Sequence, residues 1–546
     1  MPDDITHHRF RVPREDRSLL AIPGLDAAPL LVEQNRNLFA SSSCSLNGRR
    51  LTELRSAARC EALRLARAFT SSLLQADVPE TVCHSLVVSG HQPELFHVGV
   101  WAKNFALAGV ARQCRSVAVN LIIDNDTMNG TSLRIPAGTR DHLQAERVLF
   151  DTPRPSEPWE EAAIRDRSMF EKFGATVRDR LRSQWGFDPL IGSAWDAAVR
   201  QSAVSDRLCD SFTALRANLE RAWGQQNLEL PMSRLCGMES FLWFVAHLLL
   251  RLPELHAIYN ESVIDYRRTH RLRNRMQPVP NLDRLDDGWL EAPFWVWNKG
   301  DSQRGRLFAR RVGSVCELRD EKEVFASLPL ADDGPLHAAV EVLSNLAPRG
   351  IRLRTRALTT TLFARVCLAD LFLHGIGGAK YDEMTNRICE RMFGLKAPEF
   401  LTVSATLLLP LGGPFGTTEN QLHAINHKLR DLTYNPDRHI AAFPETAALI
   451  NEKSALLTAA HALRESNQLR GKLSPAQHRR LSEIRGQLRF YTGTVRAVYE
   501  VERAKIQAQL SANTLIRNRE YAFVLYPEEQ VRQFLLPLAA KPASPS

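Results

Sequence analysis

The segment 85–105 (SLVVSGHQPELFHVGVWAKNF) constrains the fold more than any other part of the chain. A short apolar run, Leu86–Val88, ends in Ser89-Gly90, and an apolar helical pattern begins near Val98. A strand, a compact polar turn and a helix in this order open a nucleotide-binding βαβ unit, in which the helix N-terminus offers free N–H groups to an anion. The segment therefore predicts a parallel sheet with a ligand site at the end of this strand.

Gly90, Gln92 and Gly99 in this segment suit a site for a nucleotide or another anion. Glycine lets the backbone approach a ligand closely, and the following helix adds its dipole. His91 and His97 are candidate catalytic residues, because histidine can donate to phosphate or carboxylate oxygens or move a proton near neutral pH. The alternative is a pair of loop histidines that cap backbone groups.

The next predicted strand, Val117–Ile123, ends in Asp124-Asn125-Asp126. Open α/β sheets bind ligands at the carboxyl ends of neighbouring parallel strands. We expect Asp124 and Asp126 to act in catalysis, by orienting an amine or a hydroxyl or by acting as a general base, and Asn125 to bind substrate. The three residues also form turns readily, which is the alternative. A role in holding Mg²⁺ stays open, but no second acidic cluster can be placed beside them, so we predict no metal site.

Gly377, Gly378 and Lys380 form the second candidate anion site. Glycines before a helix let backbone N–H groups converge on an anion, and a lysine there would neutralise its charge. Two residues that follow, Tyr381 and Asp382, are assigned to the substrate. The alternative is a helix C-cap followed by an N-cap.

Basic residues outnumber acidic ones, and the net charge of +9 is spread along the chain. A solvated Arg-rich surface explains this pattern more simply than a nucleic-acid partner does. Within the run Ile351–Thr361, the candidate clamps for a substrate carboxylate are Arg352, Arg354 and Arg356, with a plain surface position as the alternative for at least two of them.

Nine scattered cysteines form no C-x-x-C pair, which fits reduced thiols in a cytoplasmic protein better than disulfides or a zinc site. The segment Met1–Asp16 is polar and lacks the apolar region of a signal peptide. The longest apolar run, Phe241–Leu250, is about half of a membrane span and predicts a core helix. We therefore expect a cytoplasmic protein that does not enter a membrane.

The remaining patterns predict further helices and strands. Helices are expected over Leu51–Gln75, most of 151–260, Tyr259–Arg275, Arg356–Leu373 and Tyr381–Phe393. Strands are expected over Thr131–Ile135, Phe400–Leu409 and a hairpin of Trp289–Trp297 with Arg304–Arg311.

The C-terminal region carries a heptad pattern. Ser474-Pro475-Ala476-Gln477 is a capping box with proline at the first helical position. Apolar residues then recur at spacings of three and four: Leu481, Ile484, Leu488, Tyr491, Val495 and Val498. Such a seam packs a coiled-coil hairpin, with the helix Thr446–Gln468 as partner, or joins two chains as a homodimer.

These blocks resemble the cysteine-adding enzymes of bacillithiol biosynthesis. That family opens with Gly-Gln-Gln-x-x-Leu-Phe after a strand, and Gly90, Gln92, Leu95 and Phe96 match it, with His91 at its second position. Its acidic strand end is similar to Ile123–Thr127. Its later Leu-Arg-Pro and Gly-Gly-x-x-Glu-x-x-Tyr blocks are similar to Leu353–Arg356 and Gly377–Glu383.

The resemblance implies an α/β fold with a Rossmann-like parallel-sheet core, inserted helical connecting segments and a C-terminal antiparallel coiled-coil hairpin. The core would comprise 1–150 and 346–415, the connecting region 151–345, and the coiled coil 416–546. The implied reaction is amide formation between cysteine, or another amino acid, and a small amine such as glucosaminyl-malate. ATP or ADP is the implied cofactor, with or without Mg²⁺.

The first block is also similar to the opening of class I aminoacyl-tRNA synthetases of the tryptophanyl type. Ser89-Gly90-x-Gln92-Pro93 followed by His97-x-Gly99 matches their pattern. This resemblance implies that His97 and Gly99 lie against ATP phosphates. Two alternatives to the ligase follow: an adenylating or nucleotidyl-transfer enzyme, and a non-enzymatic scaffold in which the coiled coil is the functional part.

Overall fold

The computed structural model describes residues 11–80, 85–274, 276, 279–329, 335–440, 444–465 and 473–540. The chain divides into two compact units. Unit 1 consists of Met1–Ile135, Glu146–Pro410 and Arg519–Ser546, and unit 2 of Pro136–Ala145 and Leu411–Asn518. Unit 1 therefore contains most of 1–150, 151–345 and 346–415, the segments expected to form the core and the connecting region. It also contains the segment that begins at Arg519.

A six-stranded sheet lies at the centre of unit 1, in the order β1-β15-β14-β4-β5-β8. The five strands from β15 to β8 in this order run parallel to one another. The edge strand β1 pairs antiparallel with β15. The strands are β1 (Ser18–Ile22), β4 (Leu86–His91), β5 (Val117–Ile122), β8 (Leu228–Pro231), β14 (Leu371–His374) and β15 (Phe400–Thr406). The predicted parallel pairing of the strands before His91 and Asp124 is confirmed.

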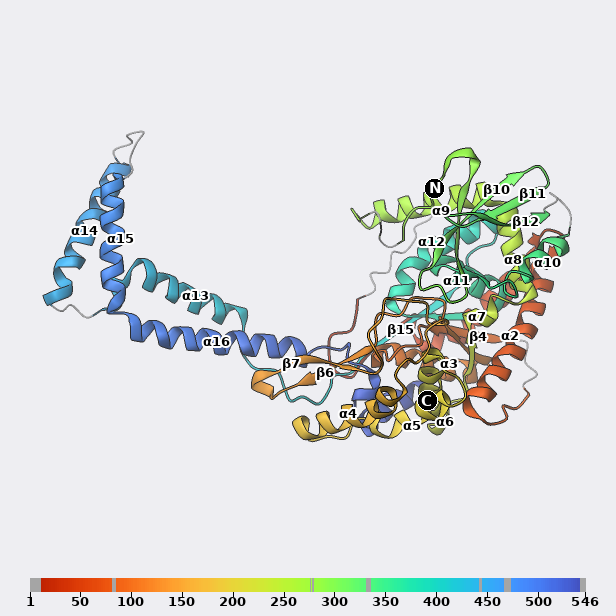
Figure 1. Ribbon diagram of the computed structural model, residues 1–546, viewed down its shortest axis with the longest axis horizontal. Coiled ribbons are helices and arrows are strands. Elements are labelled where there is room, and N and C mark those ends of the chain that lie inside the picture. The colour runs from red at the N-terminus through yellow and green to blue at the C-terminus, as the bar shows by residue number, and fades with distance from the viewer. Residues whose placement is uncertain are drawn as a thin grey trace. The chain divides into compact units, whose positions relative to one another are not determined.

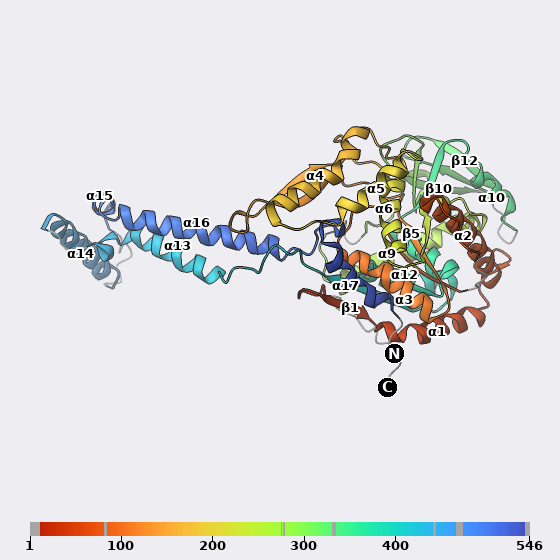
Figure 2. The same cartoon turned by 90° about the horizontal axis from the view of Figure 1, so that it is seen from below.

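Helices cover both faces of this sheet, so both alternating sets of side chains are buried, as all six residues of β5 are. Val87 packs with α1 (Ala28–Ala40) and α3 (Val98–Gln113) on one face. The neighbouring Leu86 and Val88 belong to the larger core on the other face, together with α2 (Leu51–Leu74). Figure 2 shows α1, α3 and α17 (Glu528–Ala539) along the same side of unit 1.

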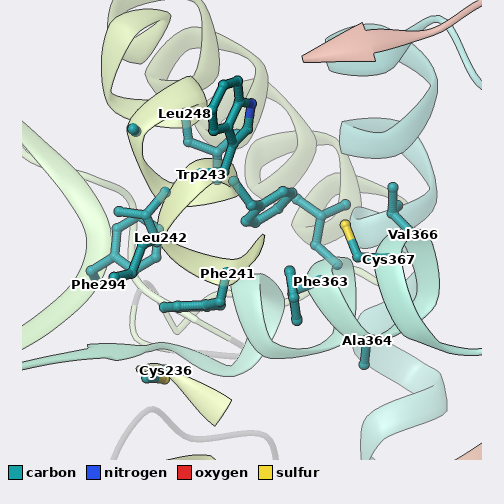
Figure 3. Packing of buried hydrophobic residues seen from close by; sticks show 14 of the residues in the cluster. Cys236, Phe241, Leu242, Trp243, Leu248, Phe294, Phe363, Ala364, Val366 and Cys367 are labelled. Carbon is teal, nitrogen blue, oxygen red and sulfur yellow. The ribbon is translucent and has the colours of Figure 1, made fainter. Parts of the chain in front are cut away.

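The larger core joins α8 (Glu239–Leu250) to the second half of the sequence. Figure 3 shows Phe241 of α8 beside Phe363 of α11 (Ala357–Phe363), with Cys367 of the π-helix η4 (Ala364–Leu368) in the same cluster. The ring centroids of Phe241 and Phe363 lie 5.1 Å apart. The prediction that the longest apolar run is a core helix is confirmed.

A five-stranded antiparallel sheet lies beside this core, in the order β12-β11-β10-β9-β13. Its central hairpin, β9 (Leu290–Asn298) with β10 (Gly305–Val312), confirms the predicted one. The other strands are β11 (Val315–Arg319), β12 (Val324–Pro329) and β13 (Ile351–Thr355).

The predicted single helix over Arg356–Leu373 is wrong. The chain forms α11 and η4, turns at Ala369-Asp370, and then enters β14. This whole stretch is almost entirely buried, so its apolar residues show no periodicity that separates a short helix from a short strand. The glycines expected just before a helix, Gly377 and Gly378, lie inside α12 (Ile376–Phe393), which begins two residues after β14 ends.

Unit 2 is mainly helical. Helices α14 (Pro444–Glu465) and α15 (Pro475–Phe490) pack together, and α13 (Glu419–Tyr434) packs along α16 (Gly493–Ile516) (Figure 1). The predicted seam is continuous only to Leu488, because the chain breaks at Tyr491-Thr492 between α15 and α16. Beyond the break, Val498 is exposed. The Ser474 capping box is confirmed, with Gln477 N–H donating to Ser474 Oγ at 3.2 Å.

The remaining elements connect these layers. They are η1 (Leu25–Ala27), β2 (Ser45–Leu46), β3 (Arg49–Arg50), β6 (Ser132–Ala137), η2 (Arg140–His142), β7 (Gln144–Leu149), α4 (Arg167–Trp185), α5 (Ile191–Ser202), α6 (Leu208–Ala222), α7 (Met232–Leu235), α9 (Leu252–Thr269), η3 (Asp286–Gly288), α10 (His337–Ser344), η5 (Pro436–His439) and η6 (Phe523–Leu525). Among the described residues, no single helix is long and apolar enough to cross a membrane, and α8 with α9 reaches that length only across an 86° bend.

Candidate functional site

The winding of the parallel sheet reverses between β4 and β14. From β4 the chain proceeds outward through β5 and β8, whereas β14 and β15 lie on the other side of β4. In open α/β sheets, ligands bind outside the carboxyl ends of the strands at such a reversal. Helix α3 follows β4 and helix α12 follows β14, so both helix N-termini lie at this edge and present positive dipole ends.

Lys103 of α3 is buried at this reversal, with 3% of its surface exposed. Its Nζ donates to the Gly90 carbonyl oxygen at 2.8 Å, and its side chain runs beside Gly375, the N-cap of α12. Within the described residues it forms no ion pair with a carboxylate. Burial lowers its pKa to about 8. A buried ammonium without a counter-ion is costly, so this position favours an anionic ligand.

Sequence reasoning missed Lys103. The signal available was a single lysine within Val98–Ala111, a stretch in which almost every residue is buried. A lysine in such a helix must either pair internally or face a ligand, because its charge is too costly to bury alone.

His97 is the N-cap of α3 and lies on the same edge. Its Nδ1 is 3.5 Å from Nη2 of Arg519, which also donates to Ser404 Oγ at 3.1 Å and to the Ala405 carbonyl at 2.8 Å. Burial, with the charges of Arg519 and Lys103, lowers the pKa of His97 to about 4. Arg519 was also missed by sequence reasoning, since nothing nearby in the sequence ties it to this strand edge.

His91 ends β4, and its ring meets Phe96 edge-on at 5.1 Å between centroids. Burial and the nearby Lys103 charge lower the pKa of His91 to about 3. Both histidines are therefore neutral near pH 7. A neutral ring can still donate one hydrogen bond to an anion, but these pKa values do not suit the expected transfer of a proton near neutral pH.

The Gly-rich stretch belongs to the first turn of α12 rather than to a loop. Gly377 and Gly378 lie within the helix next to the N-cap, and Lys380 is exposed. A Cβ at Gly378 would lie 2.8 Å from His374 Nδ1, so glycine lets the helix pack over this histidine. Tyr381 packs at the margin of the larger core.

Gly90 and Gly99 are required by packing inside the protein. A Cβ on Gly90 would lie 2.9 Å from the Leu121 carbonyl oxygen on β5. A Cβ on Gly99 would collide with the Ala405 carbonyl on β15 and with the Arg519 guanidinium. The two glycines therefore let the backbone pack closely against neighbouring strands and against Arg519. The expected close approach of a nucleotide at Gly90 and Gly99 does not explain why glycine is present there.

Asp124 points into the protein. Its carboxylate accepts from the Ser233 N–H at 2.9 Å and the Ser233 Oγ at 2.5 Å, at the start of α7. Burial and the neighbouring Glu160 raise the pKa of Asp124 to about 7. Glu160 itself forms a two-point ion pair with Arg354 at 2.8 and 2.7 Å. Asp124 therefore anchors the end of β8, away from direct contact with a ligand.

Asp126 remains partly exposed and lies beside the first block. It accepts from Gln92 Nε2 at 2.8 Å and pairs with Arg304 at 3.1 Å. Asn125 Nδ2 donates to the Thr355 carbonyl at 2.8 Å, which ties this strand end to β13. Of the three residues after β5, Asp126 is thus the one whose carboxylate stays accessible.

Two further predicted site residues are paired internally. Arg356 lies 2.7 Å from Glu291 and stacks over the Trp295 ring at 4.1 Å. Asp382 accepts from Arg365 at 2.5 Å and lies 2.7 Å from His374 Nε2, with all three side chains buried. Neither Arg356 nor Asp382 is free to bind a substrate carboxylate or amine in the way the sequence suggested.

The structure thus brings together His91, His97 and the first turn of α12 around Lys103, with Gln92 and Asp126 nearby. No group of three or more His, Cys, Asp or Glu side chains within the described ranges is arranged to hold a metal ion. No known family model matches the chain, and no curated protein matches it.

Proposed function

We propose that this protein is a cytoplasmic carbon–nitrogen ligase that joins cysteine or another amino acid to a small amine such as glucosaminyl-malate. The observation that carries the proposal is Lys103, an ammonium buried between Gly90 and the N-cap of α12 with no carboxylate paired to it in the part of the chain that the structure describes. An anionic group, either a nucleotide phosphate or a substrate carboxylate, would neutralise it.

The topology supports this proposal. The strand order β8-β5-β4-β14-β15, numbered by position along the chain, is 3-2-1-4-5, which is the order of a Rossmann-like core. The site lies at the reversal of that order, where such sheets hold nucleotides. Lys103, His97 and the first turn of α12 would hold a phosphate of ATP or ADP, and the nucleotide would supply activation of the carboxyl group.

Asp126, the partly exposed carboxylate beside Gln92, suits an amine. Asp126 is held by Gln92 and Arg304, and its carboxylate can accept a hydrogen bond from an amine nitrogen. Amide formation joins that nitrogen to the carboxyl carbon of the amino acid and releases a carboxyl oxygen as water, or as phosphate or AMP where ATP has first activated the carboxyl group. Positioning and charge stabilisation by Lys103 would then lower the barrier.

The test is a mass-spectrometric ligation assay. Purified protein is incubated with cysteine and glucosaminyl-malate, with and without ATP, and then with a panel of amino acids and amines. Lys103→Met is compared with Lys172→Met, a matched change at an exposed position of α4. We expect a product heavier by one cysteinyl group, lost in Lys103→Met and kept in Lys172→Met.

Absence of any amide product with every amino acid and amine would overturn the ligase proposal. The same protein is then tested for amino-acid-dependent exchange of pyrophosphate into ATP, because the synthetase-like block places His97 at the anion site. Exchange without an amide product would favour an adenylating enzyme. Full turnover of Lys103→Met would remove Lys103 from the site.

A further inference from the structure

A cavity lies at the opposite edge of the central sheet, at the amino end of β14. It has a volume of about 290 Å³ and is lined by residues of α1 and α2, which contact each other. Asp370, the residue before β14, also lines it. The other lining residues are Arg36, Phe39, Ala40, Thr52, Arg55, Ser56, Arg59, Cys60 and Leu63.

Three arginines converge on the single carboxylate of Asp370. Arg55 lies 3.1 Å and Arg36 3.4 Å from it, and Arg59 pairs with the same oxygen as Arg55. Three guanidinium groups against one carboxylate leave a charge of about +2 at the cavity wall. Burial and repulsion from Arg59 lower the pKa of Arg55 to about 9, as expected where positive charge is in excess.

Three of the lining residues, Arg36, Thr52 and Ser56, keep donors without an acceptor among the described residues. Arg55 is engaged by the carbonyl oxygens of Val366 and Ala369. Arg36, by contrast, is half exposed and uses only its Nε, so its two terminal nitrogens have no acceptor among the described residues. The hydroxyl groups of Thr52 and Ser56 line the same cavity and also have no hydrogen-bond partner in the described part of the chain.

We propose that this cavity is a second anion site, which takes a small dianion such as a phosphomonoester or a dicarboxylate. A charge of −2 would balance the excess at the wall, and the terminal nitrogens of Arg36 present a planar fork suited to two oxygens of one group. The cavity volume of about 290 Å³ lies just below the range for small-molecule sites, about 300–1,000 Å³, which suits a small ligand. The proposal does not depend on the ligase activity, because the two sites lie at opposite ends of β14.

Cys60 gives a readout confined to this site. It is a free, exposed thiol in the cavity wall, so a bound anion should shield it from alkylation. The full-length protein is treated with iodoacetamide, and the rate at Cys60 is followed by peptide mass spectrometry. Inorganic phosphate and succinate are the two probes, and sodium chloride at equal ionic strength is the control.

We expect phosphate or succinate to slow alkylation of Cys60 by about fourfold at a concentration of about three times its Kd. Arg36→Gln should abolish the protection, and Arg64→Gln, at an exposed position of α2, should keep it. Thr52→Ala with Ser56→Ala should weaken it without changing the charge. Which probe protects distinguishes a phosphate ligand from a dicarboxylate.

The proposal is overturned if neither probe at about 10 mM protects Cys60 more than chloride does. Equal protection in wild type and Arg36→Gln would also overturn it, since the anion would then bind elsewhere. Protection that survives in Lys103→Met shows that this cavity, and not the candidate ligase site, is responsible.

Discussion

At the scale of single residues, Lys103 is the clearest sign of function because its burial opposes stability. Its pKa of about 8 lies below the usual 10.5, so the unfolded chain binds more protons between these values. The free energy of unfolding should therefore rise with pH from about 8 to about 10.5, and the full penalty should apply below pH 8. Lys103→Met should raise the free energy of unfolding at pH 7 by about 2 kcal/mol, after the loss of the hydrogen bond to Gly90.

The measurement is urea denaturation at pH 7 and pH 10, together with phosphate binding. Lys103→Met should be more stable and bind phosphate at the sheet edge at least about tenfold more weakly. The exposed control Lys172→Met should change neither. If Lys103→Met proved less stable than wild type, Lys103 would be a structural residue.

Asp124 should make stability depend on pH in the opposite direction. Its pKa of about 7 lies above the usual 3.8, so the folded protein binds more protons between these values. The free energy of unfolding should fall as pH rises from about 4 to about 7, by up to about 1.4 kcal/mol per pH unit, and stay flat above. Asp124→Asn can still accept from the Ser233 N–H, and it should flatten that slope. An unchanged slope in urea titrations of this variant would show that another group titrates.

Residue roles were predictable where the local sequence determines them. His97 follows a strand and polar turn, so its position at the N-terminus of α3 could be predicted from its neighbours. The internal pairs of Arg356 with Glu291 and of Asp382 with Arg365 could not, because each joins residues from separate elements. An arginine or aspartate that is paired inside the protein looks the same in sequence as one that faces a substrate.

At the scale of elements, Asp382 fastens α12 to the π-helix η4. Its carboxylate pairs with Arg365 and His374, and Arg365 also donates to Asn386 at 2.7 Å. Asp382→Asn would leave the Arg365 charge buried without a counter-ion, so we expect a loss of about 3 kcal/mol in the free energy of unfolding. Urea denaturation measures this, with exposed Lys380→Gln as a control that should stay within about 0.5 kcal/mol of wild type. If Asp382→Asn kept full stability but bound ligand less tightly, Asp382 would be a substrate-binding residue rather than a structural one.

Elements with a clear pattern were predicted well, and buried ones were not. Periodicity and flanking residues predicted helix α2 and strands β4 and β9. The predicted ends lie within a few residues of the observed ones. The stretch 356–374 failed because almost all of it is buried, polar residues included, so no periodicity marks where the helix ends and the strand begins. The break at Tyr491-Thr492 was missed because the spacing of three and four residues continues through it.

At the scale of the whole molecule, the parallel sheet depends on pairings that the sequence does not state. Neighbouring strands β4 and β5 are joined by one helix, and their pairing follows from that short connection. Strand β14 pairs with the other side of β4, although all elements from β6 to η4 lie between β5 and β14 in the chain. This pairing places Gly375 beside Lys103. The candidate site is therefore a product of the topology, and only half of it could be predicted from the first block.

The last segment of unit 1 closes this arrangement. The Phe523 ring lies 4.3 Å from Trp101 and 5.5 Å from Phe96 between centroids, and Phe523 N–H donates to the Phe96 carbonyl at 2.8 Å. Helix α17 packs along α3, which carries Lys103. Residues 519–540 therefore complete the core around the candidate site, although most of unit 2 precedes them in the chain.

A stop codon at Arg519 should consequently unfold or strongly destabilise unit 1 and abolish phosphate binding at Lys103. Phe523→Ala, which keeps the segment, should cost about 3–5 kcal/mol in the free energy of unfolding. Replacing 441–490, which includes α14 and α15, with a short Gly-Ser linker should leave the unfolding of unit 1 unchanged. Thermal unfolding followed by tryptophan fluorescence compares the three, and a truncated chain that melts like wild type would show that unit 1 is complete without its last segment.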